Sequence, residues 1–291
     1  MKTVLHDRYL GSKDLTADTS IVLFGCPLDV TSSFRGGTRF APDSIRKASW
    51  TLETYSPYLR LDLDDLVFND AGNLELPQAN LLYAMKTIEE VVSEIIRDNM
   101  QFLVLGGEHL LTYPIIKTLK DIYRNLKVVH FDAHCDLRDE YEGERLSHAT
   151  AIKRIKELGV LDIYQIGIRS GTKQEFKEAN IVDNPEGLAS FIKKDDPVYL
   201  TFDMDVFDPS LVPGVTTPEP GGIMFDEFIN YVYVMADMNI VGADIVELAP
   251  DYDISFVSSI CAAKVTREII MLLSCQKTPE KDPGCLDVSH L

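Results

Sequence analysis

Residues 128–148 read VVHFDAHCDLRDEYEGERLSH and join an apolar run to a dense set of polar side chains. Asp132, His134 and Asp136 follow the apolar run at alternate positions, and His148 closes the segment. Alternate side chains of an extended chain point to one side, so we expect these three potential metal ligands to face the same way. Without cations, carboxylates crowded at the end of a buried strand would repel one another, and some would stay protonated.

Polar residues also stand at the ends of other strand-like runs. Because the carboxyl ends of parallel strands meet at one edge of a sheet, we expect these residues to converge on one crevice, where Glu247 also falls. The metal ligands expected there are four carboxylates and two imidazoles: His109, Asp132, His134, Asp136, Asp203 and Asp205.

Four carboxylates carry a charge that two divalent cations would cancel. A site rich in oxygen with few imidazoles suits Mn²⁺ better than zinc, which favours thiolates. A carboxylate shared by two such ions, roughly 3.5–4 Å apart, lets them activate a water molecule. One acidic motif alone is often a solvated loop, but six such residues at three strand ends favour metal binding. His130, within the apolar run, is expected to be a core histidine, and Cys135 a packed thiol.

Strand-like runs alternate with helical patterns along the chain. Most of the runs are continuously apolar, as in parallel strands covered on both faces. This alternation predicts an α/β fold in which a parallel sheet lies between helical layers. The strand candidates are residues 21–25, 101–105, 126–131, 163–168, 197–202 and 239–246, and the main helix candidates are 80–98, capped by Asn80, 113–123, 149–158, 225–238 and 258–273.

No low-complexity linker divides the chain. We therefore expect a single domain over residues 1–291, with a weakly structured tail from about residue 276. The segment 213–222, PGVTTPEPGG, is expected to form an ordered surface loop. Another helix is expected to begin near Asp43, after Pro42.

The composition narrows the classes of partner. The 291 residues carry a formal net charge of −18, which disfavours nucleic acid and anionic membranes and favours a cationic small molecule. No apolar run is long enough to span a membrane, and the N-terminus lacks the apolar core of a signal peptide. The cytoplasm is thus the expected compartment, and the 5 cysteines, which form no CxxC pair, are expected to be reduced thiols.

The motifs together resemble the manganese-dependent ureohydrolases, the family of arginase and agmatinase. The matching strings are GGEH at 106–109, DAHCD at 132–136, TFDMDVFDP at 201–209, PEPGG at 218–222 and GADIVELAP at 242–250, with GCPLD at 25–29 and RGGTRFAPDSIR at 35–46 before them. The resemblance spans about residues 20 to 274. It implies a three-layer α/β/α fold with a mainly parallel, roughly eight-stranded sheet, and a homo-oligomer, either a trimer or a hexamer.

The resemblance also implies a binuclear Mn²⁺ centre that hydrolyses a guanidino group to urea and an amine. One ion would be held by His109, Asp132, Asp136 and Asp203, and the other by Asp132, His134, Asp203 and Asp205, so that Asp132 and Asp203 bridge. Glu247 falls where the family has a glutamate that orients the guanidinium, and His148 where it has a histidine that shuttles protons.

Within the family, the details favour agmatinase. Arginase has an asparagine at the position of Arg138 and an acid at the position of Thr172, both of which serve the amino-acid end of arginine. The acidic stretch DEYEGERLSH resembles agmatinases and predicts a pocket rim that repels carboxylates. However, Val215 and Thr216 depart from the family's Gly-Thr-Gly-Thr-like run, and a threonine would be strained where a glycine has positive φ.

Other functions stay open at this stage. 4-Guanidinobutyrate, arginine and formiminoglutamate are alternative substrates, although each has a carboxylate. The chain could also be an inactive metal-binding relative with a regulatory role. Another two-metal hydrolase, such as a phosphatase, is disfavoured by the negative charge and by the lack of a glycine-rich phosphate loop.

Overall fold

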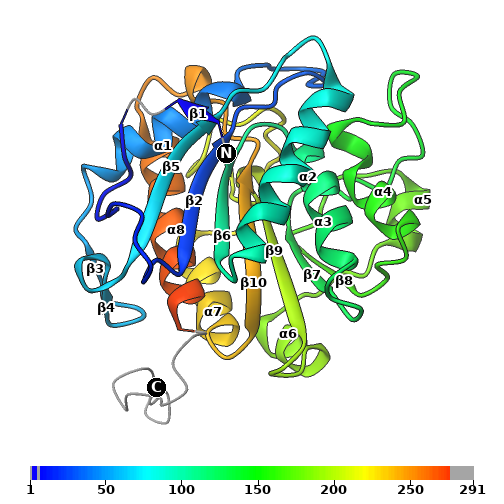
Figure 1. The fold of residues 1–291 in the computed structure, drawn as a ribbon. Coiled ribbons are helices and arrows are strands. Elements are labelled where there is room, and N and C mark those ends of the chain that lie inside the picture. The colour runs from blue at the N-terminus through cyan, green and yellow to red at the C-terminus, as the bar shows by residue number, and fades with distance from the viewer. Residues whose placement is uncertain (1, 5–6, 276–291) are drawn as a thin grey trace.

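One sheet of eight strands runs through the computed structural model, which describes residues 2–4 and 7–275 (Figure 1). The strand order is β1-β5-β2-β6-β10-β9-β7-β8; β1 is antiparallel to β5, and the other neighbouring strands are parallel. The expected α/β fold with a mainly parallel, eight-stranded sheet is confirmed. The strands are β1 (Thr3–Val4), β2 (Ile21–Cys26), β5 (Phe68–Leu74), β6 (Gln101–Gly106), β7 (Lys127–Phe131), β8 (Ile163–Ile166), β9 (Pro197–Asp203) and β10 (Asn239–Val246).

Helices cover both faces of this sheet (Figure 1). Neighbouring residues of a strand serve opposite faces: Leu23 packs in the core under α1, α7 and α8, and Phe24 in the core under α2, α3 and α4. Side chains on both faces explain the continuously apolar strands. The helices are α1 (Ala41–Ser49), α2 (Leu81–Arg97), α3 (Thr112–Lys120), α4 (Ala151–Glu157), α5 (Lys173–Glu178), α6 (Pro185–Phe191), α7 (Phe225–Met235) and α8 (Val257–Ser274).

The expected elements are present, with ends shifted by a few residues. Asn80 caps α2 as expected, because its side chain accepts a hydrogen bond from Tyr83 N at 3.1 Å. α1 begins with Pro42 in its first turn, also as expected. The tail from about residue 276, including Cys285, lies outside the described residues; the other four cysteines are free thiols. No helix within residues 2–4 and 7–275 combines the length and the apolar character needed to cross a membrane.

β5 was not predicted, because its sequence FNDAGNL has as many polar as apolar side chains and so lacks a continuous apolar run. Asp70 of this strand is buried because it forms a paired salt bridge with Arg46 of α1, with N–O distances of 2.7 and 2.8 Å. Asp70 also accepts the backbone N–H of Tyr9 at 2.8 Å. A buried ion pair is invisible to hydrophobic patterning, since its two partners lie far apart in sequence. The short hairpin of β3 (Tyr55–Ser56) and β4 (Leu61–Asp62) and the short helices α5 and α6 were missed as well.

We predict that Asp70→Asn destabilises the fold by about 3–5 kcal/mol, because it leaves the buried Arg46 guanidinium without its counter-charge. The matched control is Asp14→Asn, which removes the partner of Arg8 where the Asp14 side chain is 85% exposed. That change should cost less than about 1 kcal/mol. Urea denaturation of both variants measures the difference, and equal losses would contradict the structural role of Asp70.

Candidate metal centre

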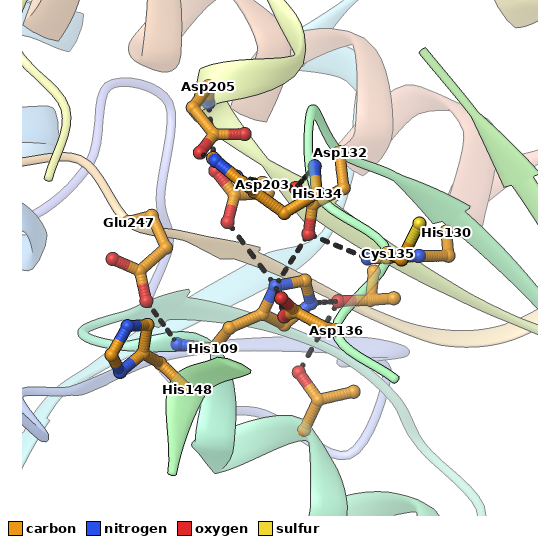
Figure 2. Close-up of polar contacts among 12 residues, drawn as sticks. His109, His130, Asp132, His134, Cys135, Asp136, His148, Asp203, Asp205 and Glu247 are labelled. Carbon is orange, nitrogen blue, oxygen red and sulfur yellow. Dashed lines mark hydrogen bonds and ion pairs between the residues drawn. The ribbon is translucent and has the colours of Figure 1, made fainter. Parts of the chain in front are cut away.

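The carboxyl ends of four adjacent central strands, β6, β10, β9 and β7, carry the expected site residues (Figure 2). A pocket of about 290 Å³ opens at this edge of the sheet. The expected convergence of the polar motifs is therefore found. The six expected ligands and Glu247 are buried, except His134, whose side chain is 26% exposed.

The first group of potential ligands surrounds the His109 ring. Its Nδ1 atom lies 3.1 Å from Asp132 Oδ2, 3.2 Å from Asp203 Oδ2 and 3.3 Å from Asp136 Oδ2. Although it is buried among three carboxylates, this nitrogen makes no hydrogen bond of acceptable geometry. A buried polar atom without a partner is costly. A ring nitrogen without a partner that faces three carboxylate oxygens is the arrangement that a cation would satisfy.

The opposite nitrogen of His109 shows which tautomer the surroundings favour. Nε2 lies 2.9 Å from Thr201 Oγ1, and that hydroxyl donates to Asp244 Oδ1 at 2.6 Å. Since the hydroxyl proton is used, Thr201 accepts from an Nε2–H group, which leaves the lone pair of a neutral ring on Nδ1, toward the carboxylates. Tyr199 and Thr112 also donate hydroxyl protons to Asp244, at 2.7 and 2.8 Å. This outer support fixes the ring for metal binding.

The second group shares Asp132 with the first. His134 Nδ1 lies 2.9 Å from Asp205 Oδ2 and 3.5 Å from Asp132 Oδ1. The other Asp205 oxygen accepts the backbone N–H of Ala133 at 3.0 Å. The two oxygens of Asp132 thus face different clusters, which is the geometry required of a bridging carboxylate.

The expected extended conformation of these ligand runs is wrong, although the side chains do converge. Asp136 has φ of 52°, so the chain turns there instead of continuing as a strand. Asp203 ends β9 and caps a 3₁₀ turn at Met204–Val206, where its Oδ1 accepts Asp205 N at 2.8 Å. Local turns therefore aim the carboxylates.

His130 is the core histidine expected from its apolar surroundings. Its Nδ1 lies 3.0 Å from Gln165 Nε2, an amide donor, so the proton of the neutral ring is on Nε2. Nε2 lies 2.8 Å from Asp132 Oδ2. His130 therefore donates to Asp132 and orients it, although its ring is close enough to the first group to be counted among possible ligands. Cys135 is fully buried, as expected of a packed thiol.

Electrostatics make this cluster a site for cations. Burial, and then the charge of Asp132, raise the pKa of Asp136 well above its usual value; burial and Asp205 do the same to Asp203. Burial opposes ionisation of Asp132, but three surrounding histidines outweigh it and hold its pKa well below the usual value. Protons would thus be needed to balance the cluster, and divalent cations can replace them. The donor set fits such ions, with Mn²⁺ among those that favour oxygen and imidazole.

Glu247 lies beside these groups with both oxygens fixed. His109 N–H donates to Oε1 at 2.6 Å, and the Thr216 hydroxyl donates to Oε2. Burial raises the pKa of Glu247 to about 7. The backbone of Glu247 has φ of 63°, in the left-handed region that non-glycine residues seldom adopt. Thr216 itself is not among the residues with positive φ, so the backbone strain considered for a threonine at that position does not occur.

The loop that contains Thr216 was expected at the surface, but its first half is buried. Val215 and Thr216 are 1% and 3% exposed, and Val215 forms an antiparallel bridge with Leu248. The first half of the loop is therefore part of the buried structure beside the site. Thr217 lines the pocket, and its hydroxyl lies 3.3 Å from Asp205 Oδ2.

His148 enters the pocket from the 3₁₀ turn His148–Thr150 just before α4, and it packs against Thr31 of the loop after β2. Its backbone N–H donates to Thr31 Oγ1 at 2.9 Å, and its Nδ1 lies 3.3 Å from the same oxygen. Thr31 in turn donates to Glu108 at 2.9 Å, and Glu108 also accepts two backbone N–H groups of this loop. Burial lowers the pKa of His148. The ring is thus neutral near pH 7 and able to accept a proton.

Gly107 allows this loop to cross the end of β6. A β-carbon at Gly107 would lie 1.9 Å from the carbonyl oxygen of Leu28. Leu28 and Thr31 belong to the same short loop. Leu28 O accepts a hydrogen bond from Glu108 N at 2.7 Å. Close approach of two backbones explains the second glycine of the GGEH string.

The expected acidic rim is wrong. The loop after Asp136 borders the pocket, but through Arg138 and Tyr141; Asp139, Glu140, Glu142 and Glu144 do not line it. Asp139 turns toward the α4 residues Lys153 and Arg154, at 3.7 and 3.8 Å.

A different carboxylate, that of Glu175, lines the outer wall of the pocket. Its Oε2 lies 3.8 Å from Arg138 Nε and accepts Thr172 N at 2.8 Å. The Arg138 guanidinium also lies over the Tyr141 ring, 5.1 Å from the centroid.

The supporting residues were missed from sequence, and only some of them left a signal there. Asp244 is the one charged residue in the apolar run of β10, and Glu108 stands beside an expected ligand, so both could have been noticed. Nothing in the sequence distinguishes Thr31, Thr201 or Thr216 from other threonines, because their roles depend on which segments pack together.

Known proteins share this fold and sequence. The family model for the arginase family matches residues 19–272. The agmatinase of Halalkalibacterium halodurans is 40% identical over 277 residues, covering 90% of this chain and 95% of that protein. The guanidinobutyrase of Pseudomonas aeruginosa is 32% identical over 270 residues, covering 86% of this chain and 85% of that protein. The crystal structure of the agmatine ureohydrolase of Thermoplasma volcanium matches with a TM-score of 0.84 and 30% identity, covering 94% of this chain and 96% of that chain. The chain therefore belongs to the arginase family of ureohydrolases.

Proposed function

We propose that this protein is a binuclear manganese ureohydrolase that hydrolyses agmatine to putrescine and urea. The observation that carries the proposal is the unpartnered Nδ1 of His109 among three carboxylates, in a pocket that Glu247 and His148 also line. The similarity to agmatinases over nine-tenths of the chain supports the choice of reaction.

The proposed ligands form two sets. His109, Asp132, Asp136 and Asp203 would hold one Mn²⁺ ion, and Asp132, His134, Asp203 and Asp205 the other. Ions bound there would act as Lewis acids that activate water for attack on the guanidino carbon.

Glu247 is proposed to orient the guanidinium group. A carboxylate has about four lone-pair sites, and the bonds from His109 N and Thr216 Oγ1 use one on each oxygen. One site on each oxygen stays available, which suits paired hydrogen bonds to a planar guanidinium.

His148 is proposed to carry protons between water and the leaving amine. Thr31 holds the Nδ1 side of the ring, so Nε2, which lies 3.5 Å from Ser33 Oγ, can act on the pocket. A neutral imidazole suits acceptance of a proton and its later return to the departing nitrogen.

Agmatine has a positive charge at both ends, and the pocket offers a carboxylate for each. Glu247 would receive the guanidinium, and Glu175 on the outer wall would favour the ammonium. 4-Guanidinobutyrate is the second candidate, because Arg138 lines the same wall and could receive a carboxylate. To do so, Arg138 would have to leave Glu175 and Tyr141, so we favour agmatine.

The first prediction from this proposal is that the purified protein binds two Mn²⁺ ions per chain. Asp132→Ala and Asp203→Ala should lose more metal than Asp136→Ala, since each proposed bridge serves both ions. Asp139→Ala is the matched control, a carboxylate from the same segment that turns toward α4 and should leave the metal content unchanged. Elemental analysis after Mn²⁺ loading measures this, and a wild-type content of one ion or none rules out the binuclear assignment.

The second prediction is that His148→Ala keeps its metal but lowers kcat by about 10²–10⁴-fold, the usual effect of losing an acid–base group. Thr150→Val is the control, because it removes hydrogen bonds of the 3₁₀ turn His148–Thr150 without changing the imidazole. It should lower the melting temperature and leave most of the turnover. If His148→Ala loses only thermal stability, its role is structural.

The third prediction tests the substrate. The kcat/KM for agmatine should exceed the values for arginine and 4-guanidinobutyrate by at least about tenfold. The reason is that the Glu175 carboxylate would repel the carboxylate of either acid, and like charges ~4–8 Å apart repel by about 2–4 kcal/mol at an effective dielectric near 20. Glu175→Gln should reduce the preference for agmatine over the two acids, provided that the melting temperature of the variant stays near that of the wild type. Preference for either carboxylate-bearing substrate would overturn agmatine while leaving ureohydrolase chemistry in place.

A further inference from the structure

We infer that Thr216 is a positioning residue that holds the Glu247 carboxylate in its guanidinium-binding orientation through the Thr216 hydroxyl. The inference rests on the proposed role of Glu247 and adds a determinant of substrate affinity to it.

The backbone of the Thr216 loop runs alongside the end of β10. Ala249 N donates to Gly214 O at 2.8 Å, Val215 bridges Leu248, and Thr216 N donates to Glu247 O at 3.4 Å. This antiparallel pairing places Thr216 directly opposite Glu247, so that one residue contacts both the backbone and the side chain of the other.

The hydroxyl of Thr216 supplies half of the hold on the carboxylate. Figure 2 shows the other half, the bond from His109 N to Glu247, which is made to Oε1 at 2.6 Å. The Thr216 hydroxyl donates to Oε2. With both oxygens held, the carboxylate plane can rotate only by breaking at least one of these bonds. With one bond alone, the carboxylate could turn about it.

The Glu247 backbone makes this hold more important. A left-handed φ costs free energy for a residue with a side chain, and it persists only where the surroundings over-determine it. Glu247 N donates to Gly107 O at 2.9 Å, so the backbone is tied on one side to β6 and on the other to the Thr216 loop. The hydroxyl extends this restraint to the reactive end of the side chain.

The neighbouring residue separates loop stability from carboxylate orientation. Val215 is 1% exposed and packs in the core under α1, α7 and α8. Its side chain has no hydrogen-bond donor to offer Glu247. Packing by Val215 holds the loop in place, and the polar bond of Thr216 acts on Glu247. The two functions can therefore be removed one at a time.

The test compares three variants of the full-length, Mn²⁺-loaded protein: Thr216→Val, Thr216→Ser and Val215→Ala. Thr216→Val keeps the shape but removes the donor, and should lower kcat/KM by about 10- to 100-fold, the usual effect of losing a hydrogen bond to a charged group. A rise in KM should carry most of this loss. Thr216→Ser retains the donor and should recover most of the activity. Val215→Ala should lower the melting temperature and leave KM within about threefold of wild type.

Each measurement is made with agmatine and 4-guanidinobutyrate, with bound Mn²⁺ and melting temperature recorded alongside. The inference is overturned if Thr216→Val keeps its KM, or if Thr216→Ser fails as badly as Thr216→Val. A Thr216→Val protein that loses metal as well as activity would also overturn it, because the hydroxyl would then serve the fold. If the wild type releases urea from neither compound, the proposed function fails first and the role of Thr216 falls with it.

Discussion

Repulsion among buried carboxylates is the constraint on which the rest of the site depends. Four aspartates at most 7% exposed meet at one edge of the sheet, and Glu247 joins them. Removing charged groups from water is costly unless donors or cations compensate. Histidines, backbone N–H groups and hydroxyls meet part of that need, yet His109 Nδ1, which faces three of the carboxylate oxygens, makes no hydrogen bond to any of them.

The hydrogen bonds that support the buried carboxylates and His109 form successive layers that extend well into the core. Asp244 lies behind the first layer, and its three hydroxyl donors come from β9 and α3. Burial raises the pKa of Asp244, and the hydroxyls oppose that rise. The metal centre and the packing of the sheet centre thus depend on each other, since the His109 ring that faces the carboxylates is held by groups that belong to the core.

The sequence predicted those parts of the site whose signal is local. An apolar run followed by DAHCD or DMD is readable wherever it occurs, and the sheet topology then brings such ends together. The turns that aim the ligands could not be read, because positive φ at Asp136 depends on the loops that pack around it. The fate of Asp139 was misjudged for a similar reason: its partners, Lys153 and Arg154, lie on the next helix, and a charge count cannot show which way a side chain turns.

The close crossing at Gly107 ties His148, the proposed proton-transfer group, to a position that has no polar side chain. The loop that passes 1.9 Å from the place of the missing β-carbon also supplies Thr31, which holds both the backbone and the ring of His148. A methyl group at position 107 would press on the loop itself. Its effect would pass to His148 through Thr31, which is 117 positions away from His148 in the sequence but whose hydroxyl lies 2.9 Å from the His148 backbone nitrogen. Clearance between two backbones, a purely steric quantity, therefore sets how well the His148 imidazole is aligned in the pocket.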